Sequence, residues 1–277
     1  MRLFVHHRTE YRFSEPQQRV VQLLRLTPGS HEGQNVVDWH IDVACDARLK
    51  RSRDGYGNEV TMLYVDGPIE RIGLTVTGEV LTIDRAGLVS GTPEPLPPVF
   101  FTQTTALTAP CSAIRDFAHG IEAAGGNALD RIHRLNHALY EYLQFGPRHD
   151  SADRTAAETF EAGNGVCRDF AHVFIAAARL IGFPARYVSG HFYRPETEAA
   201  EYNSAHGWAE AYVEDYGWIA FDPANDICPH DAYVRVATGL DYRDAAPVSG
   251  QRVGGGHELL EIGVRVGLSQ TQIQTQS

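Results

Sequence analysis

The sequence lacks a long hydrophobic run and lacks a surplus of basic residues, and each absence excludes a class of protein. No apolar stretch approaches the roughly 20 residues that a transmembrane helix needs. Lysine and arginine number 24 against 35 aspartates and glutamates, which gives a net charge of −11 and argues against nucleic acid or an anionic membrane as partner. Because the first apolar stretch is too short for a signal peptide, we expect a cytoplasmic protein.

Cysteine is also scarce, with four residues in the whole chain and no CxxC pair among them. We therefore expect free thiols, and we expect no zinc site, no other metal and no cofactor. Cys45, Cys111 and Cys228 stand in contexts typical of small structural thiols. Cys167 stands in a different context, described below.

The first third of the chain has the alternating apolar pattern of β-strands. The predicted strands cover residues 2–13, 20–26, 36–43, 60–65 and 72–83. Short strands separated by turn residues are typical of a β-sandwich, so residues 1–92 are predicted to form a sandwich domain. A proline-rich stretch, 93–103, follows and is interpreted as a linker, because proline breaks both helix and sheet.

The second half of the chain changes to helical periodicity. Helices are predicted over residues 112–122, 129–142 and 155–162, and Ile132, Leu135 and Leu139 follow the spacing of one apolar helix face. We expect a second domain over residues 104–268, in which later strands at 233–238 and 259–266 complete a sheet. A polar segment, 269–277, is predicted to be a flexible tail.

The stretch around Cys167 is the most informative in the sequence. Gly163-Asn-Gly-Val precedes Cys167, and the apolar residues that follow it predict a buried helix that stops at Gly182 and Pro184. In the first turn of that helix, free backbone N–H groups and the helix dipole favour a thiolate and can bind an oxyanion. Taken alone, the position suits a small buried helix residue equally well.

A hairpin is predicted to bring a histidine and an aspartate together. Residues 204–213 alternate as a strand that carries His206, a turn follows, and the return strand from Trp218 ends at Asp222-Pro223. Each residue also has an ordinary interpretation, as a structural histidine and as a turn initiator. A thiol at a helix start, a histidine on one strand and an aspartate on the next is nevertheless the nucleophile, base and orienter arrangement of thiol catalysis.

Two further residues are predicted to bind substrate. Trp208 shares a strand face with His206 and would wall a substrate channel, although a core aromatic fits the pattern as well. Asn225 follows Asp222-Pro223 and would serve as a substitute orienter if Asp222 were only a turn residue. The polar loop 194–204 before His206 is interpreted either as a substrate-contacting lid or as a solvated loop.

Three polar residues on the Cys167 helix are expected to have structural roles. His172 lies five positions after Cys167, so its side chain is displaced around the helix, and we interpret it as a buried, hydrogen-bonded residue. Arg168 and Asp169 would either support the catalytic residues or lie at the surface, and we expect them at the surface.

Four segments together resemble the bacterial transglutaminase-like proteins, which are often described as cysteine proteases. They are Gly165-Val-Cys-Arg-Asp-Phe-Ala-His172, Ala185-Arg-Tyr-Val-Ser-Gly190, Ala205-His-Gly-Trp-Ala-Glu-Ala211 and Trp218-Ile-Ala-Phe-Asp-Pro223. The first half resembles the β domain of that family. The resemblance implies an α+β fold, with an N-terminal β-sandwich followed by a transglutaminase-like (papain-like) cysteine-hydrolase core. It also implies the triad Cys167, His206 and Asp222. The chain departs from the family at Ala224-Asn225-Asp226, which alters the turn after Asp222.

The resemblance and the residues together predict thiol-dependent acyl transfer on a peptide or protein amide, by a cysteine protease, an amidase or a transglutaminase. The order of the triad also resembles arylamine N-acetyltransferases, but the Arg-Gly-Gly motif of that family is missing. A non-hydrolytic acyltransferase, and a non-enzymatic peptide-binding module of a peptide-ligating system, stay open as alternatives. The oligomeric state is not predicted.

Overall fold

The computed structural model describes residues 1–146, 153–195 and 205–268. The predicted tail, 269–277, and all but the first two residues of the predicted loop 194–204 lie outside the described residues. No helix in these described ranges is long and apolar enough to cross a membrane.

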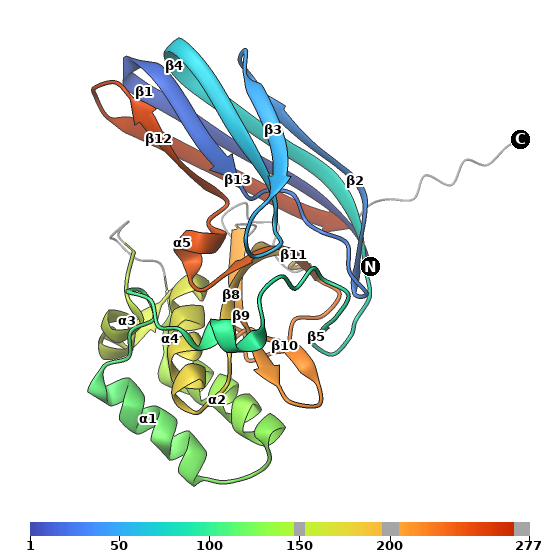
Figure 1. Cartoon of the computed structure of the whole chain (residues 1–277), viewed down its shortest axis with the longest axis vertical. Coiled ribbons are helices and arrows are strands. Elements are labelled where there is room, and N and C mark those ends of the chain that lie inside the picture. Colours follow the sequence, from blue (N-terminus) through green and yellow to red (C-terminus); the bar gives the residue numbers. More distant parts are fainter. Residues whose placement is uncertain (147–152, 196–204, 269–277) are drawn as a thin grey trace, which may run out of the picture.

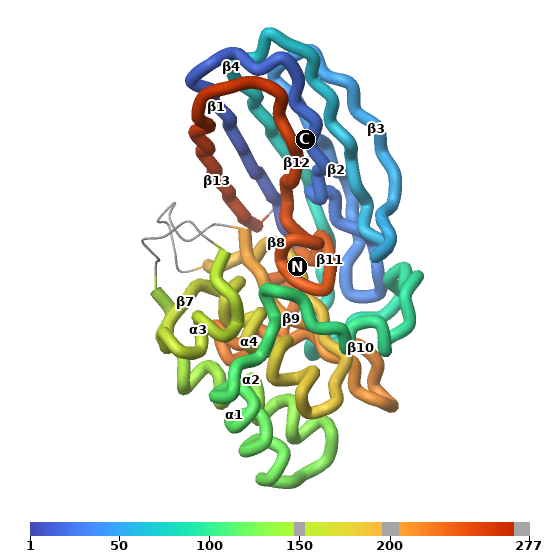
Figure 2. Tube along the Cα trace, turned by 60° about the vertical axis from the view of Figure 1, so that its left-hand side comes forward, coloured from blue at the N-terminus to red at the C-terminus, as the bar shows by residue number. Residues whose placement is uncertain are grey.

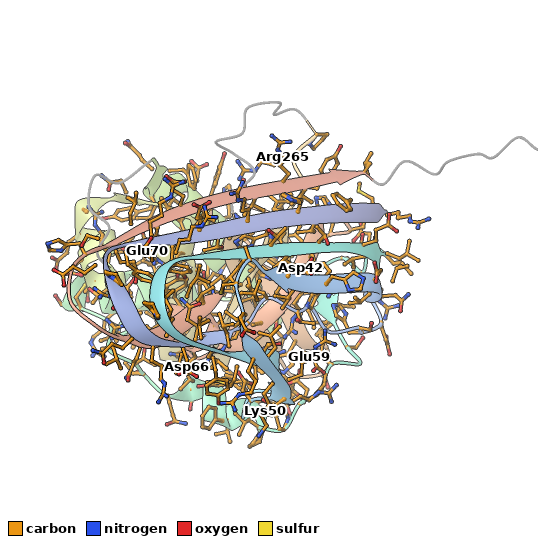
Figure 3. The ribbon with its side chains drawn as sticks, turned by 90° about the horizontal axis from the view of Figure 1, so that it is seen from above. Asp42, Lys50, Glu59, Asp66, Glu70 and Arg265 are labelled. Atoms are coloured by element: carbon orange, nitrogen blue, oxygen red, sulfur yellow. The ribbon has the colours of Figure 1, made fainter. Side chains whose placement is uncertain are left out.

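Two long strands, β1 (Arg2–Leu24) and β4 (Glu59–Thr82), form the frame of the N-terminal half. They pair antiparallel almost from end to end, with register shifts around Gln17. Seen from above, both strands bend back near Asp66 and Glu70 (Figure 3), so that one hydrogen-bonded sheet becomes two layers. The layers are extended by β13 (Glu258–Leu268) and β2 (Gln34–Val43) on one half, and by β12 (Val248–Val253) and β3 (Arg48–Arg53) on the other.

Apolar side chains from both halves of the bent strands fill the space between these layers. Tyr11 and Val20 come from the two halves of β1, and Leu63 and Ile72 come from the two halves of β4. Because side chains alternate along a strand, the inward residues of both layers meet in one core. The sandwich predicted from the sequence is confirmed in this form.

A second sheet lies at the centre of the C-terminal half. Its strands follow the order β11-β8-β9-β10-β5. They are β11 (Tyr233–Gly239), β8 (Ala185–Phe192), β9 (Ala205–Val213), β10 (Gly217–Phe221) and β5 (Leu88–Val89). The β9–β10 hairpin is the one that the sequence predicted, with Ala220 opposite Glu210. Figure 2 shows this half, with its helices, at the opposite end of the molecule from the sandwich.

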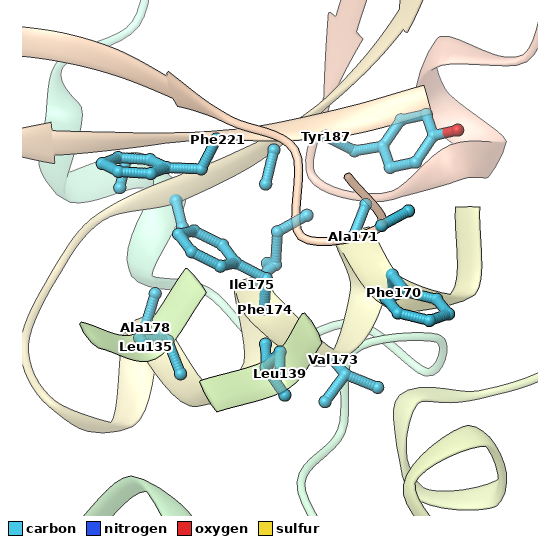
Figure 4. Close-up of a cluster of buried hydrophobic side chains, with 14 of the residues drawn as sticks. Leu135, Leu139, Phe170, Ala171, Val173, Phe174, Ile175, Ala178, Tyr187 and Phe221 are labelled. Carbon is cyan, nitrogen blue, oxygen red and sulfur yellow. The ribbon is translucent and has the colours of Figure 1, made fainter. Parts of the chain in front are cut away.

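Helix α4 (Cys167–Leu180) packs on the sheet and is surrounded by the other helices (Figure 1). These are α1 (Ser112–Ala123), α2 (Ala128–Tyr142) and α3 (Ala156–Ala162); shorter elements are η1 (Pro98–Thr102), α5 (Tyr242–Ala245), β6 (Gln144–Phe145) and β7 (Asn164–Gly165). Every residue of α4 from Asp169 to Ala178 is buried. Phe174 stacks on Phe221 of β10, with ring centroids 5.3 Å apart (Figure 4). This burial fixes the start of α4 relative to the sheet.

The course of the chain after the core sheet differs from the sequence prediction. Residues 233–238 do join the core sheet, since β11 pairs with β8. The assignment of residues 259–266 to that sheet was wrong, because β13 pairs with β1 of the sandwich, with Val266 opposite Val5. An alternating apolar strand fits either sheet, and the sequence pattern alone does not select the partner. The predicted domain boundaries stay predictions.

Candidate active site

Cys167 is the first residue of α4, with Val166 as the preceding cap residue. At this position the backbone N–H groups of Cys167 and Arg168 have no acceptor within the helix. The carboxylate of Asp169 reaches back and accepts from the Val166 N–H at 3.0 Å. Asp169 is completely buried, so the surface position expected for it was wrong. A Cβ on Gly165 would lie 2.8 Å from the Asp169 Cβ, so this cap requires glycine there.

His206 lies at the start of β9, and its side chain contacts the other two predicted catalytic residues. Its Nε2 lies 2.6 Å from Asp222 Oδ2, which leaves Nδ1 for the Cys167 side chain. Cys167 forms a hydrogen bond with the His206 ring and accepts another from the Gly207 backbone N–H. The structure therefore brings together Cys167, His206 and Asp222 from a helix start, a strand start and the residue after β10.

Asp222 is completely buried and saturated with hydrogen-bond donors. Besides His206, its carboxylate accepts from Ala224 N at 3.0 Å, from Asn225 Nδ2 at 2.6 Å and from Tyr233 Oη at 2.7 Å. Burial opposes ionisation, but His206 and these donors outweigh it and lower the pKa of Asp222. Sequence reasoning missed Tyr233, because nothing in its local pattern on β11 separates it from a core aromatic.

The electrostatics of the site favour a thiolate–imidazolium pair. Burial alone would raise the pKa of the Cys167 thiol, but the charge and hydrogen bond of His206 and the Gly207 N–H lower it below 9.0. Burial would lower the pKa of His206, but Asp222 and Cys167 raise it to about 10. At neutral pH the imidazole therefore keeps its proton, and this cation favours the thiolate form of Cys167.

Gly207 lets an aromatic ring approach the nucleophile. A Cβ at this position would lie 2.0 Å from Tyr187 Oη and 2.8 Å from its Cζ. Tyr187, on β8, is almost completely buried and lines the same cavity as Cys167. Glycine at position 207 thus makes room for the Tyr187 ring. Its backbone N–H also lies close to the sulfur of Cys167.

A cavity of about 370 Å³ opens on Cys167 and is lined by both halves of the molecule. The core contributes Cys167, His206 and Tyr187 among others. The sandwich contributes side chains of β1, β12 and β13: His7, Thr9, Tyr11, Val248, Leu260 and Ile262. Figure 1 shows these strands descending onto the end of the core where β8 and α5 lie. The sandwich is therefore one wall of the candidate active site.

The two residues predicted to bind substrate lie behind and beside the triad. Trp208 is 2% exposed, stacks beside the His206 ring with centroids 6.2 Å apart, and does not line the cavity at Cys167. Asn225 donates to Asp222 and accepts from Arg194 at 3.3 Å. The substrate-binding role of each stays a prediction, and both positions suit support of the triad.

His172 has the structural role that the sequence predicted. It is completely buried, and its Nε2 accepts from the Tyr242 backbone N–H at 3.1 Å. Burial, helped by the nearby Arg168, lowers its pKa to about 3, so the ring is neutral at physiological pH. Arg168 pairs with Asp153 at 3.0 Å and lies over the Tyr242 ring.

Two family profiles match the chain in the order of its two halves. The profile of the bacterial transglutaminase-like N-terminal region matches residues 3–81, and that of the transglutaminase-like superfamily matches residues 115–223. The second match includes Cys167, His206 and Asp222.

Similar proteins extend this likeness to nearly the whole chain. The Mycobacterium leprae protein ML0607 is 25% identical over 288 residues, covering 96% of this chain and 98% of its own. The Mycobacterium tuberculosis protein Rv2569c is 27% identical over 272 residues, covering 89% and 86%. The crystal structure of a putative cysteine protease from Cytophaga hutchinsonii matches with a TM-score of 0.78 at 20% identity, covering 99% of this chain and 92% of that one. This last likeness shows the fold.

Proposed function

Because this chain belongs to the bacterial transglutaminase-like proteins, we propose that it catalyses thiol-dependent acyl transfer on an amide bond through Cys167, His206 and Asp222. The acyl donor is a peptide or protein amide. One observation carries the proposal: a single imidazole bonds through Nε2 to a buried carboxylate and also forms a hydrogen bond with a thiol at a helix start.

The arrangement supports each step of such a reaction. The Cys167 thiolate adds to the amide carbonyl carbon and forms a C–S bond, while the carbonyl oxygen becomes an oxyanion. The free N–H of Cys167 donates to that oxyanion, and a single donor of this kind is worth about 10²–10³ in rate. His206 then gives its Nδ1 proton to the departing amine as the C–N bond breaks, which leaves a thioester.

The second half of the reaction regenerates the thiolate. His206 Nδ1 takes a proton from the incoming nucleophile, which attacks the thioester carbonyl and displaces the sulfur. Water as the nucleophile gives a protease or amidase, and a primary amine gives a transglutaminase. Asp222 holds the ring orientation throughout, through the 2.6 Å hydrogen bond to Nε2.

Acyl-enzyme trapping tests the proposal. The protein is incubated with a library of peptide amides, quenched in acid and analysed by intact mass, with Cys167→Ala as the blank. We expect a mass increase equal to one acyl group that maps to Cys167. Cys228→Ala is the matched control, since it removes a thiol that does not line the cavity. An adduct that survives in Cys167→Ala, or is lost in Cys228→Ala, contradicts the proposal.

Release of the trapped acyl group then distinguishes the two reactions. Water alone regenerates the free enzyme in a hydrolase, whereas a transferase requires an added amine and yields the substituted amide.

A further inference from the structure

Two buried polar atoms, on residues that line the Cys167 cavity, have no hydrogen-bond partner among the described residues. They are Ser189 Oγ, on β8 of the core, and His7 Nδ1, on β1 of the sandwich. Ser189 is 4% exposed and His7 is 3% exposed. A buried polar group left unsatisfied costs about 1–3 kcal/mol, so two such groups in one cavity indicate a binding role.

The pair suits a ligand group that both donates and accepts hydrogen bonds. His7 Nε2 is already engaged with Thr9 Oγ1 at 3.1 Å, which leaves Nδ1 as the free ring nitrogen. The Thr9 hydroxyl can donate or accept, so His7 Nδ1 can take either role, and the Ser189 hydroxyl can take both. A hydroxyl or a carboxamide complements this pair.

Each charged side chain among the described lining residues of the cavity already has a partner of opposite charge. Arg168 is paired with Asp153 at 3.0 Å and stacked on Tyr242, and His206 is paired with Asp222. Burial lowers the pKa of His7 to about 4, so this ring is neutral at pH 7. A carboxylate or an ammonium group entering here would lose hydration without gaining a partner.

The cavity also has an apolar side that can accept the rest of a peptide. Leu260 and Ile262 of β13 line it and are 44% and 59% exposed, so they are accessible from solvent. They stand opposite Tyr11 and Thr9 in the sheet register, on the face of β1 that carries His7. The apolar side chains of β13 therefore lie on the same wall of the cavity as His7.

We propose that Ser189 and His7 form a specificity subsite that binds a neutral hydroxyl- or carboxamide-bearing side chain of the acyl donor, within two residues of the reacting carbonyl. The inference rests on the proposed function and adds the substrate class to it. It also gives the N-terminal sheet a direct role in substrate selection.

A matched set of covalent probes tests the subsite. Each probe is an acetylated dipeptide vinyl sulfone that carries serine, asparagine, 2-aminobutyrate, aspartate or lysine at one of the two positions next to the vinyl group. The second-order rate of Cys167 modification is followed by intact mass. Serine and 2-aminobutyrate have nearly the same shape, so the ratio of their rates isolates the contribution of the hydroxyl group. Both rates are measured on the same protein variant, and variants are compared by this ratio.

The expected result is a serine-to-aminobutyrate ratio of about 5 to 10 in the natural protein, the effect of roughly one net hydrogen bond. Aspartate and lysine probes should react at least about 10-fold more slowly than serine. Ser189→Ala should bring the ratio close to one. The matched control, Ser90→Ala, should keep the ratio, since Ser90 bonds to Glu32 away from the cavity.

A ratio near one in the natural protein, or a ratio unchanged by Ser189→Ala, overturns the subsite. His7→Phe is the second variant, and it should lower the ratio in the same direction. Iodoacetamide separates this failure from failure of the proposed function. If iodoacetamide modifies Cys167 ahead of the other thiols while the probes show no selectivity, only the subsite is wrong. If no reagent prefers Cys167, the proposed function is wrong as well.

Discussion

His206 Nε2 lies 2.6 Å from Asp222 Oδ2, and both side chains are buried. This relationship decides which ring nitrogen handles the proton in the proposed reaction, because only Nδ1 is left for Cys167. It also explains the charge state of the site. The carboxylate keeps the ring protonated, and the protonated ring lowers the pKa of the thiol.

The first prediction concerns the reactivity of the four thiols. Because the pKa of Cys167 is lowered and burial raises that of Cys228 to about 11, iodoacetamide at pH 7 should modify Cys167 first. In a pH series, the midpoint for Cys167 should fall below 9.0. His206→Ala should move this midpoint upward, since the variant loses the cation that favours the thiolate. Peptide mapping after alkylation measures both effects, and equal labelling of all four cysteines would contradict a catalytic Cys167.

The second prediction concerns the orienting carboxylate. Asp222→Asn should lower acyl transfer by up to about 10⁴-fold, as the same change does in a serine triad, because the ring loses its anionic partner. Tyr233→Phe removes one of the donors to Asp222 and should cost far less, about 10-fold. Steady-state kinetics on the trapped substrate class compare the two. An unchanged rate in Asp222→Asn would make Asp222 a turn residue and move the orienting role to Asn225.

The local signals of this site were strong enough to be found from the sequence. The apolar run after Cys167 predicted α4, and the alternation before and after the turn at Asp215 predicted the β9–β10 hairpin that places His206 and Asp222 at one end. Both depend on periodicity within one segment, which a sequence shows directly. The roles of the three residues in catalysis stay predictions.

Features that depend on distant parts of the chain were not predictable in this way. Asp169 is polar and was expected at the surface, but its bond to the Val166 N–H makes its burial possible. Glu94 lies in the proline-rich stretch interpreted as a linker, yet it makes two hydrogen bonds to the buried Arg186, at 2.7 and 3.0 Å. The residues next to a charged side chain in the sequence do not indicate which partner it contacts in the folded protein.

The third prediction concerns the buried ion pairs behind the core sheet. Glu210 is completely buried and bonds to Arg186 at 2.7 Å and to Arg235 at 2.7 Å. Burial raises its pKa, but the two guanidinium groups outweigh this and lower it to about 2. Glu210→Gln should lower the free energy of unfolding by about 3–5 kcal/mol, because two guanidinium groups lose this anion and, in the described part of the chain, only Arg186 keeps a second carboxylate, that of Glu94.

Chemical denaturation measures this loss, with Asp66→Asn as the control. Asp66 pairs with Arg19 at 2.7 Å, but both side chains are exposed, so this change should cost at most about 1 kcal/mol. Equal effects of the two substitutions would show that the buried network contributes little.

The fourth prediction concerns the contact between Gly207 and Tyr187. Gly207→Ala places a methyl group 2.0 Å from Tyr187 Oη, so the ring must move and the N–H near the sulfur moves with it. The alkylation rate of Cys167 at pH 7 should fall by about 10-fold or more. Adding Tyr187→Phe removes the nearest atom and should restore part of the rate. A single variant that reacts like the natural protein would show that the contact is not needed.

The last prediction concerns stability in mild acid. His191 on β8 and His7 on β1 pack edge to face, with ring centroids 5.8 Å apart, where the sandwich meets the core. Burial, together with the nearby His7, lowers the pKa of His191 to about 3. Between pH 6.5 and about 4 the unfolded chain binds a proton at this residue and the folded chain does not, so stability is present above pH 6.5 and falls as the pH decreases.

His191→Gln should remove this contribution, because glutamine does not titrate. The slope of unfolding free energy against pH should become shallower by up to about 1.4 kcal/mol per pH unit in that window. Urea denaturation at half-unit steps from pH 7 to pH 4 measures the slope. His119→Gln is the control, since His119 is exposed on α1 and its loss should leave the slope as it is. An unchanged slope in His191→Gln would mean that the ring takes up its proton in the folded protein, and that the junction between the sandwich and the core tolerates a charge.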